Sequence, residues 1–106
     1  MPLFKTKREV FNWIKSGQKT IDIRKGEAWK GETAVIQCGL DILRMIIIKK
    51  ETGNLSEIIT EDNYKAIIPT ANSLEEAIKY LQKLYGNLEG IFSAYYLQPI
   101  INSNCK

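Results

Sequence analysis

One stretch, from Gly17 to Arg24, constrains the fold more than any other, because a helix end, a turn and a short strand follow one another within it. In a strand, successive side chains point to opposite faces. Ile21 and Ile23 therefore share one face, and the other face carries three polar residues: Thr20, Asp22 and Arg24. We predict that the isoleucine face packs in the core and that the polar face forms a site, with the flexible ammonium of Lys19 beside it.

Length and composition indicate one soluble globular domain. The chain has 106 residues, of which 44% are hydrophobic and 25% are charged, and these values are ordinary for such a domain. No apolar run approaches the roughly 20 residues that span a bilayer. The N-terminal segment Met1–Lys5 lacks the long apolar core of a secretory signal. We therefore expect a cytoplasmic protein that makes no contact with a membrane.

The absence of histidine limits the chemistry that the chain can perform. With no histidine and only two distant cysteines, Cys38 and Cys105, the chain lacks the ligands of an ordinary zinc site and the base of Ser-His or Cys-His catalysis. We expect no metal and no other cofactor. Any reaction would have to use lysine, carboxylate, tyrosine, threonine or serine side chains.

The hydrophobic pattern predicts five strands and three helices. The expected strands are at residues 3–4, 20–24, 33–38, 42–50 and 90–97, and the expected helices at residues 7–16, 60–67 and 73–85. Thr6 to Glu9 and Ser73 to Glu76 both have the capping-box pattern that opens a helix, and Gly17 supplies the left-handed residue that closes the first one. Strands and helices do not alternate regularly, which favours a small mixed β-barrel flanked by helices.

Positive charge is concentrated in the first third of the chain. Eight lysine or arginine residues and three acidic residues give residues 1–30 a net charge of +5, and the remaining residues carry −2 because the whole chain is +3. A basic face of this kind attracts polyanions. The alternative is ordinary solvated helix and loop surface.

The layout resembles the ASCH family, single-domain relatives of the PUA RNA-binding barrel. The resemblance is carried by Gly17-Gln18-Lys19-Thr20-Ile21-Asp22-Ile23-Arg24, by the turn Trp29-Lys30-Gly31-Glu32, and by the late capped helix before an aromatic strand. It covers roughly residues 3 to 97. What it implies is an α+β fold with a small mixed PUA-like β-barrel flanked by two to three helices, formed by residues 1–98, with a poorly ordered C-terminal tail at 99–106.

The same resemblance implies an RNA-binding or RNA-associated module that takes RNA or a modified nucleoside. Six residues would form its binding surface: Lys19, Thr20, Asp22, Arg24, Trp29 and Lys30. The cations would meet phosphates or base edges, and Asp22 would orient them or accept a proton from a base amino group. Apart from the resemblance, Trp29 is the single aromatic residue of a charged loop and is a candidate to stack on a base.

An alternative implied by the family is a small amidohydrolase. Some ASCH relatives remove the acyl group from N4-acetylcytidine with a lysine, a threonine and a glutamate. By position these are Lys19, Asp22 and Thr70 here, so two of the three residue types differ, and the catalytic residues would be Lys19 and Asp22. Catalysis would also require the cleft to lower the pKa of Lys19, whereas the carboxylate of Asp22 would raise it. Whether the protein is an enzyme therefore stays open.

Each candidate also has a structural interpretation. Asp22 and Arg24 could form an ordinary ion pair on a strand, Lys19 could be a solvated surface lysine, and Trp29 could plug one end of a barrel. A protein-interaction adaptor without a small ligand is a third possible function. The sequence leaves the oligomeric state open.

Overall fold

The computed structural model describes residues 2–100, which form five strands and four helices. The strands are β1 (Leu3–Lys5), β2 (Ile21–Lys25), β3 (Thr33–Cys38), β4 (Asp41–Asn54) and β5 (Ile91–Pro99). The helices are α1 (Arg8–Ser16), α2 (Leu55–Ile58), α3 (Tyr64–Ile67) and α4 (Leu74–Tyr85). Two to three helices were predicted. The additional one, α2, is a single turn that directly follows β4.

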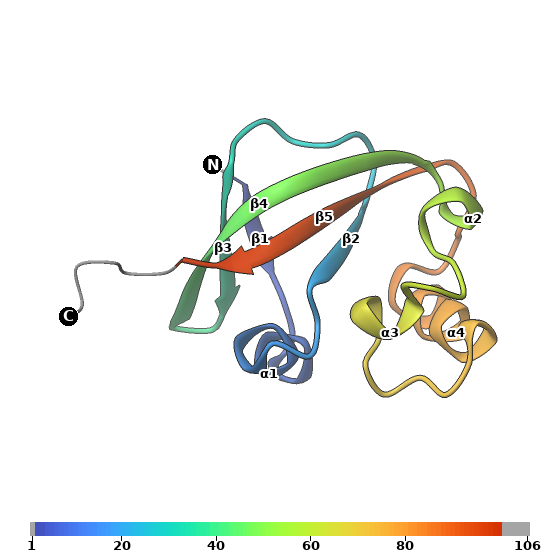
Figure 1. The fold of residues 1–106 in the computed structure, drawn as a ribbon, viewed down its shortest axis with the longest axis horizontal. Helices are drawn as coiled ribbons and strands as arrows, with labels where there is room; N and C mark the ends of the chain where they lie inside the picture. The colour runs from blue at the N-terminus through green and yellow to red at the C-terminus, as the bar shows by residue number, and fades with distance from the viewer. Residues whose placement is uncertain (1, 101–106) are drawn as a thin grey trace.

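All five strands form one curled sheet in the order β1-β3-β4-β5-β2 (Figure 1). β1 pairs with β3 in parallel, and the other three pairings are antiparallel. β1 and β2 are the two edge strands, so the sheet is a half-barrel that stays open between them. The predicted α+β class is confirmed, and the predicted small mixed barrel with flanking helices is present as this half-barrel.

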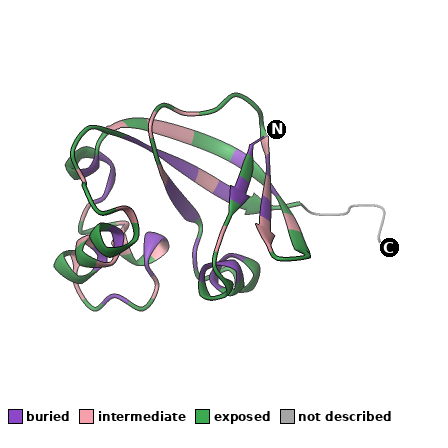
Figure 2. Ribbon diagram, turned by 180° about the vertical axis from the view of Figure 1, so that it is seen from behind, coloured by how far each residue is buried: buried purple, intermediate pink, exposed green. Residues whose placement is uncertain are grey.

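The concave face of the sheet and the helices enclose the core (Figure 2). Phe4, Ile36 and Phe92 from three different strands are fully buried. α1 buries Val10, Phe11, Trp13 and Ile14. As predicted, Ile21 and Ile23 of β2 also belong to this core. No described helix is long and apolar enough to cross a membrane.

β4 is longer than predicted. The strand was expected to end at residue 50, but Gly53 and Asn54 still pair with β5, opposite Phe92 and Ile91. The chain turns after Asn54, whose backbone N–H donates to the Glu57 carboxylate at 2.8 Å at the start of α2. At the other end of the sheet, β5 extends to Pro99, paired with Met45. Most of the predicted tail, residues 101–106, lies outside the described residues.

The first of the two predicted capping boxes is wrong, and the second forms in part. The Ser73 hydroxyl accepts a hydrogen bond from the backbone N–H of Glu76 at 3.1 Å and caps α4 as expected, but the Glu76 carboxylate accepts from the backbone N–H of Asn72 rather than from that of Ser73. α1, however, starts one residue later than expected, with Lys7 at its cap position and no side-chain cap. Thr6 is not available because both its backbone N–H and its hydroxyl donate to the carbonyl of Gln37, which extends the pairing of β1 with β3.

Candidate functional site

A cleft of about 190 Å³ opens where β2, the segment after β1, and α4 meet. Its lining includes the apolar side chains of Val10, Ile68, Leu81 and Leu84, and the phenol rings of Tyr80 and Tyr85. The polar lining residues are Lys5, Thr6, Lys7, Lys19, Asp22 and Arg24. The cleft therefore combines apolar and aromatic walls with four cations and one carboxylate.

Lys19 is a buried lysine, which excludes the interpretation as a solvated surface residue. Gly17 ends α1 with a φ of +86°, and the chain turns back so that the N–H of Lys19 donates to the carbonyl of Trp13 at 3.0 Å. Only 4% of Lys19 is exposed. Its Nζ donates to the carbonyls of Ile21 at 2.8 Å and Ile67 at 2.5 Å.

Burial sets the protonation of Lys19. Loss of solvent lowers its pKa to about 8, and this effect exceeds the opposing attraction of Asp22, while the charge of Arg24 lowers the pKa further. We had expected the Asp22 carboxylate to keep the lysine firmly charged. At neutral pH the ammonium is still the main form, and since it has three donors, one remains beyond the two bonds to carbonyls.

Asp22 and Arg24 form the ion pair that was the structural alternative for these two residues. Arg24 Nε donates to Asp22 Oδ2 at 2.6 Å, and only 3% of Asp22 is exposed. Burial alone would lower the pKa of Arg24, but the charge and hydrogen bond of Asp22 raise it above its usual value. Asp22 Oδ1 makes no hydrogen bond among the described residues. Because every fully buried side-chain oxygen in that part of the chain has a partner, Oδ1 is reached by solvent from the cleft.

The polar side chains also close the open side of the half-barrel. The carbonyls of Ile21 and Ile23 lie on the edge of β2 that pairs with no other strand of residues 2–100, and they accept hydrogen bonds from Lys19 Nζ and from the Tyr85 hydroxyl. Arg24 Nη1 donates across the gap to the carbonyl of Lys5 in β1 at 3.2 Å. These residues therefore have a structural role at the seam between β1 and β2, whatever they bind.

Sequence reasoning missed the two tyrosines of α4. The Tyr85 hydroxyl bonds the Ile23 carbonyl at 2.5 Å, and burial raises its pKa to about 12. The Tyr80 hydroxyl donates to the Glu9 carboxylate at 2.8 Å, and Lys7 Nζ lies 4.7 Å from the centre of its ring. Neither tyrosine was among the predicted binding residues. The available signal was two tyrosines on an amphipathic helix whose other inward positions are aliphatic.

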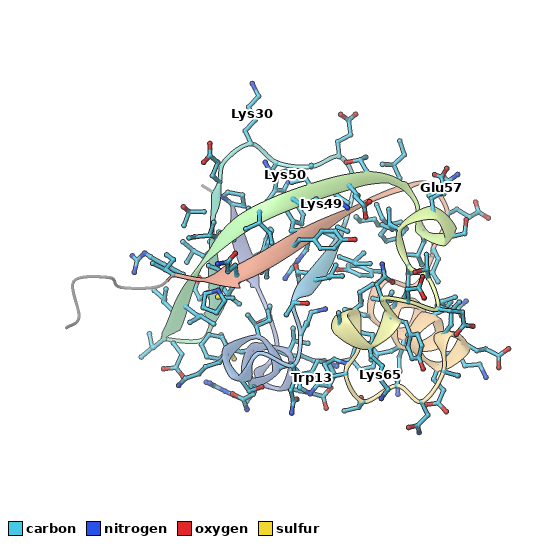
Figure 3. The ribbon with its side chains drawn as sticks, viewed as in Figure 1. Trp13, Lys30, Lys49, Lys50, Glu57 and Lys65 are labelled. Atoms are coloured by element: carbon cyan, nitrogen blue, oxygen red, sulfur yellow. The ribbon has the colours of Figure 1, made fainter. Side chains whose placement is uncertain are left out.

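Three predicted binding residues lie outside the cleft lining: Thr20, Trp29 and Lys30. Thr20 is exposed, and its backbone bonds Ala66 and Leu97. Lys30 extends into solvent from the loop between β2 and β3 (Figure 3). Trp29, in the same loop, packs on Phe4 with ring centres 5.5 Å apart but stays 46% exposed. Thr70, the position of the family's glutamate, is exposed and does not line the cleft either.

No protein-family model and no curated protein sequence matches the chain. Solved structures do. The crystal structure of the hypothetical protein PH0355 matches with a TM-score of 0.76 at 18% identity, over 92% of this chain and 97% of that one. The solution structure of protein PF0455 from Pyrococcus furiosus matches with a TM-score of 0.68 at 18% identity, over 95% and 98% of the two chains.

The crystal structure of ASCH from Zymomonas mobilis matches with a TM-score of 0.63 at 14% identity and covers 91% of this chain. The chain has an ASCH-like fold. It spans 65% of the length of the Zymomonas ASCH chain. The ASCH-like layout predicted from the Gly17–Arg24 stretch is thus confirmed at the level of the fold.

The cleft of this ASCH-like fold has a defined hydrogen-bonding capacity. It offers a carboxylate oxygen of Asp22 as acceptor, a third hydrogen of Lys19 as donor, and flat phenol rings on its wall. Within residues 2–100, no cluster of three or more acidic or cysteine side chains could hold a metal ion. The cleft thus suits a small planar ligand that carries both a donor and an acceptor on one edge.

Proposed function

We propose that the cleft binds one base of an RNA or of a modified nucleoside, and that the protein is an RNA-associated binding module. One observation carries this proposal: a hydrogen-bond acceptor of Asp22 and a hydrogen-bond donor of Lys19, neither used within the described part of the chain, line the same aromatic-walled cleft. Base edges present such pairs. The cytosine edge, for example, places the N4 amino donor, which a carboxylate accepts, beside the N3 acceptor.

Size and charge support the same ligand class. Drug-sized ligands occupy pockets of roughly 300–1,000 Å³, so a cleft of about 190 Å³ suits a single ring system. Sequence-specific RNA recognition uses bases that are splayed out of a strand, stacked on aromatic side chains and hydrogen-bonded on their edges. Lys5 and Lys7 are exposed at the cleft, where they can meet the phosphates.

The test is a binding titration at low salt with cytidine, adenosine, guanosine and uridine monophosphates and with short single-stranded RNAs. Asp22→Asn keeps the shape of the side chain but replaces two acceptor oxygens with one acceptor and one donor. We therefore expect at least a fivefold loss of affinity. The matched control is Asp41→Asn, in an exposed ion pair with Arg8, which should bind within twofold of wild type. Absence of binding to every nucleotide and RNA would refute the proposal.

A second candidate, hydrolysis of an acylated cytidine, is favoured by one observation. A buried lysine with a pKa of about 8 is about one-tenth neutral at pH 7, and that fraction could take part in proton transfer. Amide hydrolysis also needs a second proton-transfer group. Asp22 is the one carboxylate among the residues that line the cleft, and it is already paired with Arg24.

We therefore predict that N4-acetylcytidine is hydrolysed slowly or not at all. Incubation with this nucleoside followed by product analysis tests the prediction. Thr70→Glu should not create activity, either alone or with Asp22→Thr, because position 70 lies outside the cleft. Robust turnover that is abolished by both Lys19→Ala and Asp22→Ala would contradict this prediction and favour the hydrolase.

A further inference from the structure

Trp29 is an exposed aromatic side chain that the fold holds in a fixed place. Its backbone N–H donates to the hydroxyl of Tyr95 at 2.9 Å, and its carbonyl accepts from Lys50 Nζ at 2.6 Å. Tyr95 is fully buried, so its hydroxyl ties the loop to the core. Hydrogen bonds to both backbone groups of Trp29 therefore hold the residue in place, while 46% of Trp29 remains exposed.

The ring of Phe4 connects Trp29 to the cleft. Arg24 Cζ lies 4.7 Å from the centre of the Phe4 ring, and the Trp29 ring centre lies 5.5 Å from it. Arg24 and Trp29 are therefore at most about 10 Å apart. Figure 2 shows the loop that carries Trp29 arching from the end of β2 to the start of β3. Arg24 lines the cleft, and it and Trp29 both pack on the fully buried ring of Phe4.

We propose that Trp29 is the stacking platform for a second base, so that the ligand is a single-stranded RNA of at least two nucleotides rather than a free nucleoside. This inference rests on the proposed function of the cleft. Bases in a stacked strand are about 3.4 Å apart, so roughly 10 Å corresponds to about three stacked nucleotides and to fewer in an extended strand.

The charges beside Trp29 are compatible with a polyanion. Lys50 is held against the Trp29 carbonyl, and the Arg24 guanidinium lies over the ring of Phe4, on which Trp29 also packs. Lys30 follows Trp29 in the chain and is exposed (Figure 3). Two acidic residues of the same loop, Glu27 and Glu32, are also exposed. Affinity at this position is therefore expected to come from stacking more than from charge.

The test compares one oligonucleotide with one mononucleotide on the full chain. A base stacked on an aromatic ring contributes about 1–3 kcal/mol, so Trp29→Ala should weaken binding of a single-stranded RNA hexamer at least fivefold. Binding of the monophosphate preferred by the cleft should stay within twofold. Trp29→Phe keeps an aromatic ring on Phe4, so its affinity for the hexamer should lie between those of wild type and Trp29→Ala. Ile48→Ala, at a side chain 61% exposed on β4, is the control and should change neither.

Fluorescence gives an independent measurement. The chain has two tryptophans, Trp13 and Trp29, and only Trp29 is exposed. Binding of the hexamer should quench the emission of wild type and leave that of Trp29→Phe unquenched. Suppose that Trp29→Ala leaves the hexamer affinity unchanged while Asp22→Asn still weakens the binding of both ligands. That result would overturn the stacking role of Trp29 but not the proposal that the cleft binds a base. An equal loss for both ligands in Trp29→Ala would also overturn the stacking role, and absence of binding to either ligand would overturn both proposals.

Discussion

At the scale of single residues, Lys19 is the feature that the local sequence describes least well. Its neighbours are polar, and a lysine beside a glycine turn is usually solvated. It is buried because α1 ends at Gly17 and because α3, nearly fifty residues later, places the Ile67 carbonyl within 2.5 Å of its ammonium. That partner is a backbone atom in a distant segment. No local pattern in the sequence reports it.

The buried Lys19 predicts how stability depends on pH. Its pKa is about 8 in the folded protein and 10.5 as the reference value, so between these values the unfolded chain binds more protons and stability rises with pH. From pH 7.5 to 9.5 we expect the free energy of unfolding to gain about 2 kcal/mol from this group. Above pH 10 a second group acts in the opposite direction. Burial raises the pKa of Tyr85 to about 12, so the unfolded chain loses this proton first and stability falls as the pH rises.

Urea denaturation at the two pH values measures this effect. Lys19→Met should remove the rise, whereas Lys15→Met, at an exposed position of α1, should keep it. Lys19→Met should also cost about 2–4 kcal/mol at neutral pH, because two backbone carbonyls lose their partner. An equal pH dependence in wild type and Lys19→Met would show that the lysine is not the group that titrates.

At the scale of elements, two identical cap patterns have different outcomes. Ser73 caps α4, whereas Thr6 pairs with Gln37. We predict that Ser73→Ala lowers the free energy of unfolding by about 1 kcal/mol and that Thr6→Ala changes it by less than half as much. Thermal and urea denaturation would measure both. If Thr6→Ala lowered the free energy of unfolding more than Ser73→Ala, the hydroxyl bond of Thr6 to the Gln37 carbonyl would stabilise the fold more than its length of 3.5 Å indicates.

The docking of α4 on the open edge of β2 gives a second prediction at this scale. Tyr85→Phe removes the donor to the Ile23 carbonyl, in a partly buried place, and should cost about 1–2 kcal/mol. Tyr80→Phe removes only an exposed bond to Glu9 and should cost less. Amide exchange would locate the effect, with faster exchange at the end of α4 in Tyr85→Phe but not in Tyr80→Phe. Uniform acceleration across the whole sheet would contradict this local role.

The elements themselves were largely predictable, and their side-chain partners were not. Alternation placed Ile21 and Ile23 in the core and put Asp22 beside Arg24, because period and spacing are local properties. The glycine closing α1 was equally local. The residues predicted to share one binding surface lie in two places. Lys19 and Arg24 line the cleft, whereas Trp29 and Lys30 lie in a loop beyond Phe4. The reason is that the curl of the sheet, which local sequence does not report, decides which strand ends and loops meet.

At the scale of the whole molecule, the charge of the N-terminal third predicts how RNA binding responds to salt. Two of the four cleft cations are already committed, Lys19 to carbonyls and Arg24 to Asp22. Lys5 and Lys7 are exposed and have no carboxylate or carbonyl partner among the described residues, so they are the cations that can bind phosphates. Each phosphate contact to a single strand contributes about −0.7 to the slope of log affinity against log salt. With two to four contacts, we predict a slope between about −1.4 and −2.8 for a single-stranded hexamer.

A variant that carries both Lys5→Ala and Lys7→Ala should reduce the magnitude of this slope by about 1.4, since two contacts are lost. The matched control carries Lys65→Ala and Lys79→Ala, two exposed positions on α3 and α4 outside the cleft lining, and should keep the wild-type slope. Titrations at four or more salt concentrations measure it. A wild-type slope steeper than about −4, or an equal reduction in both double variants, would mean that phosphates contact the protein well beyond this cleft, and the net charge of +3 would then act as a diffuse attraction rather than through two placed lysines.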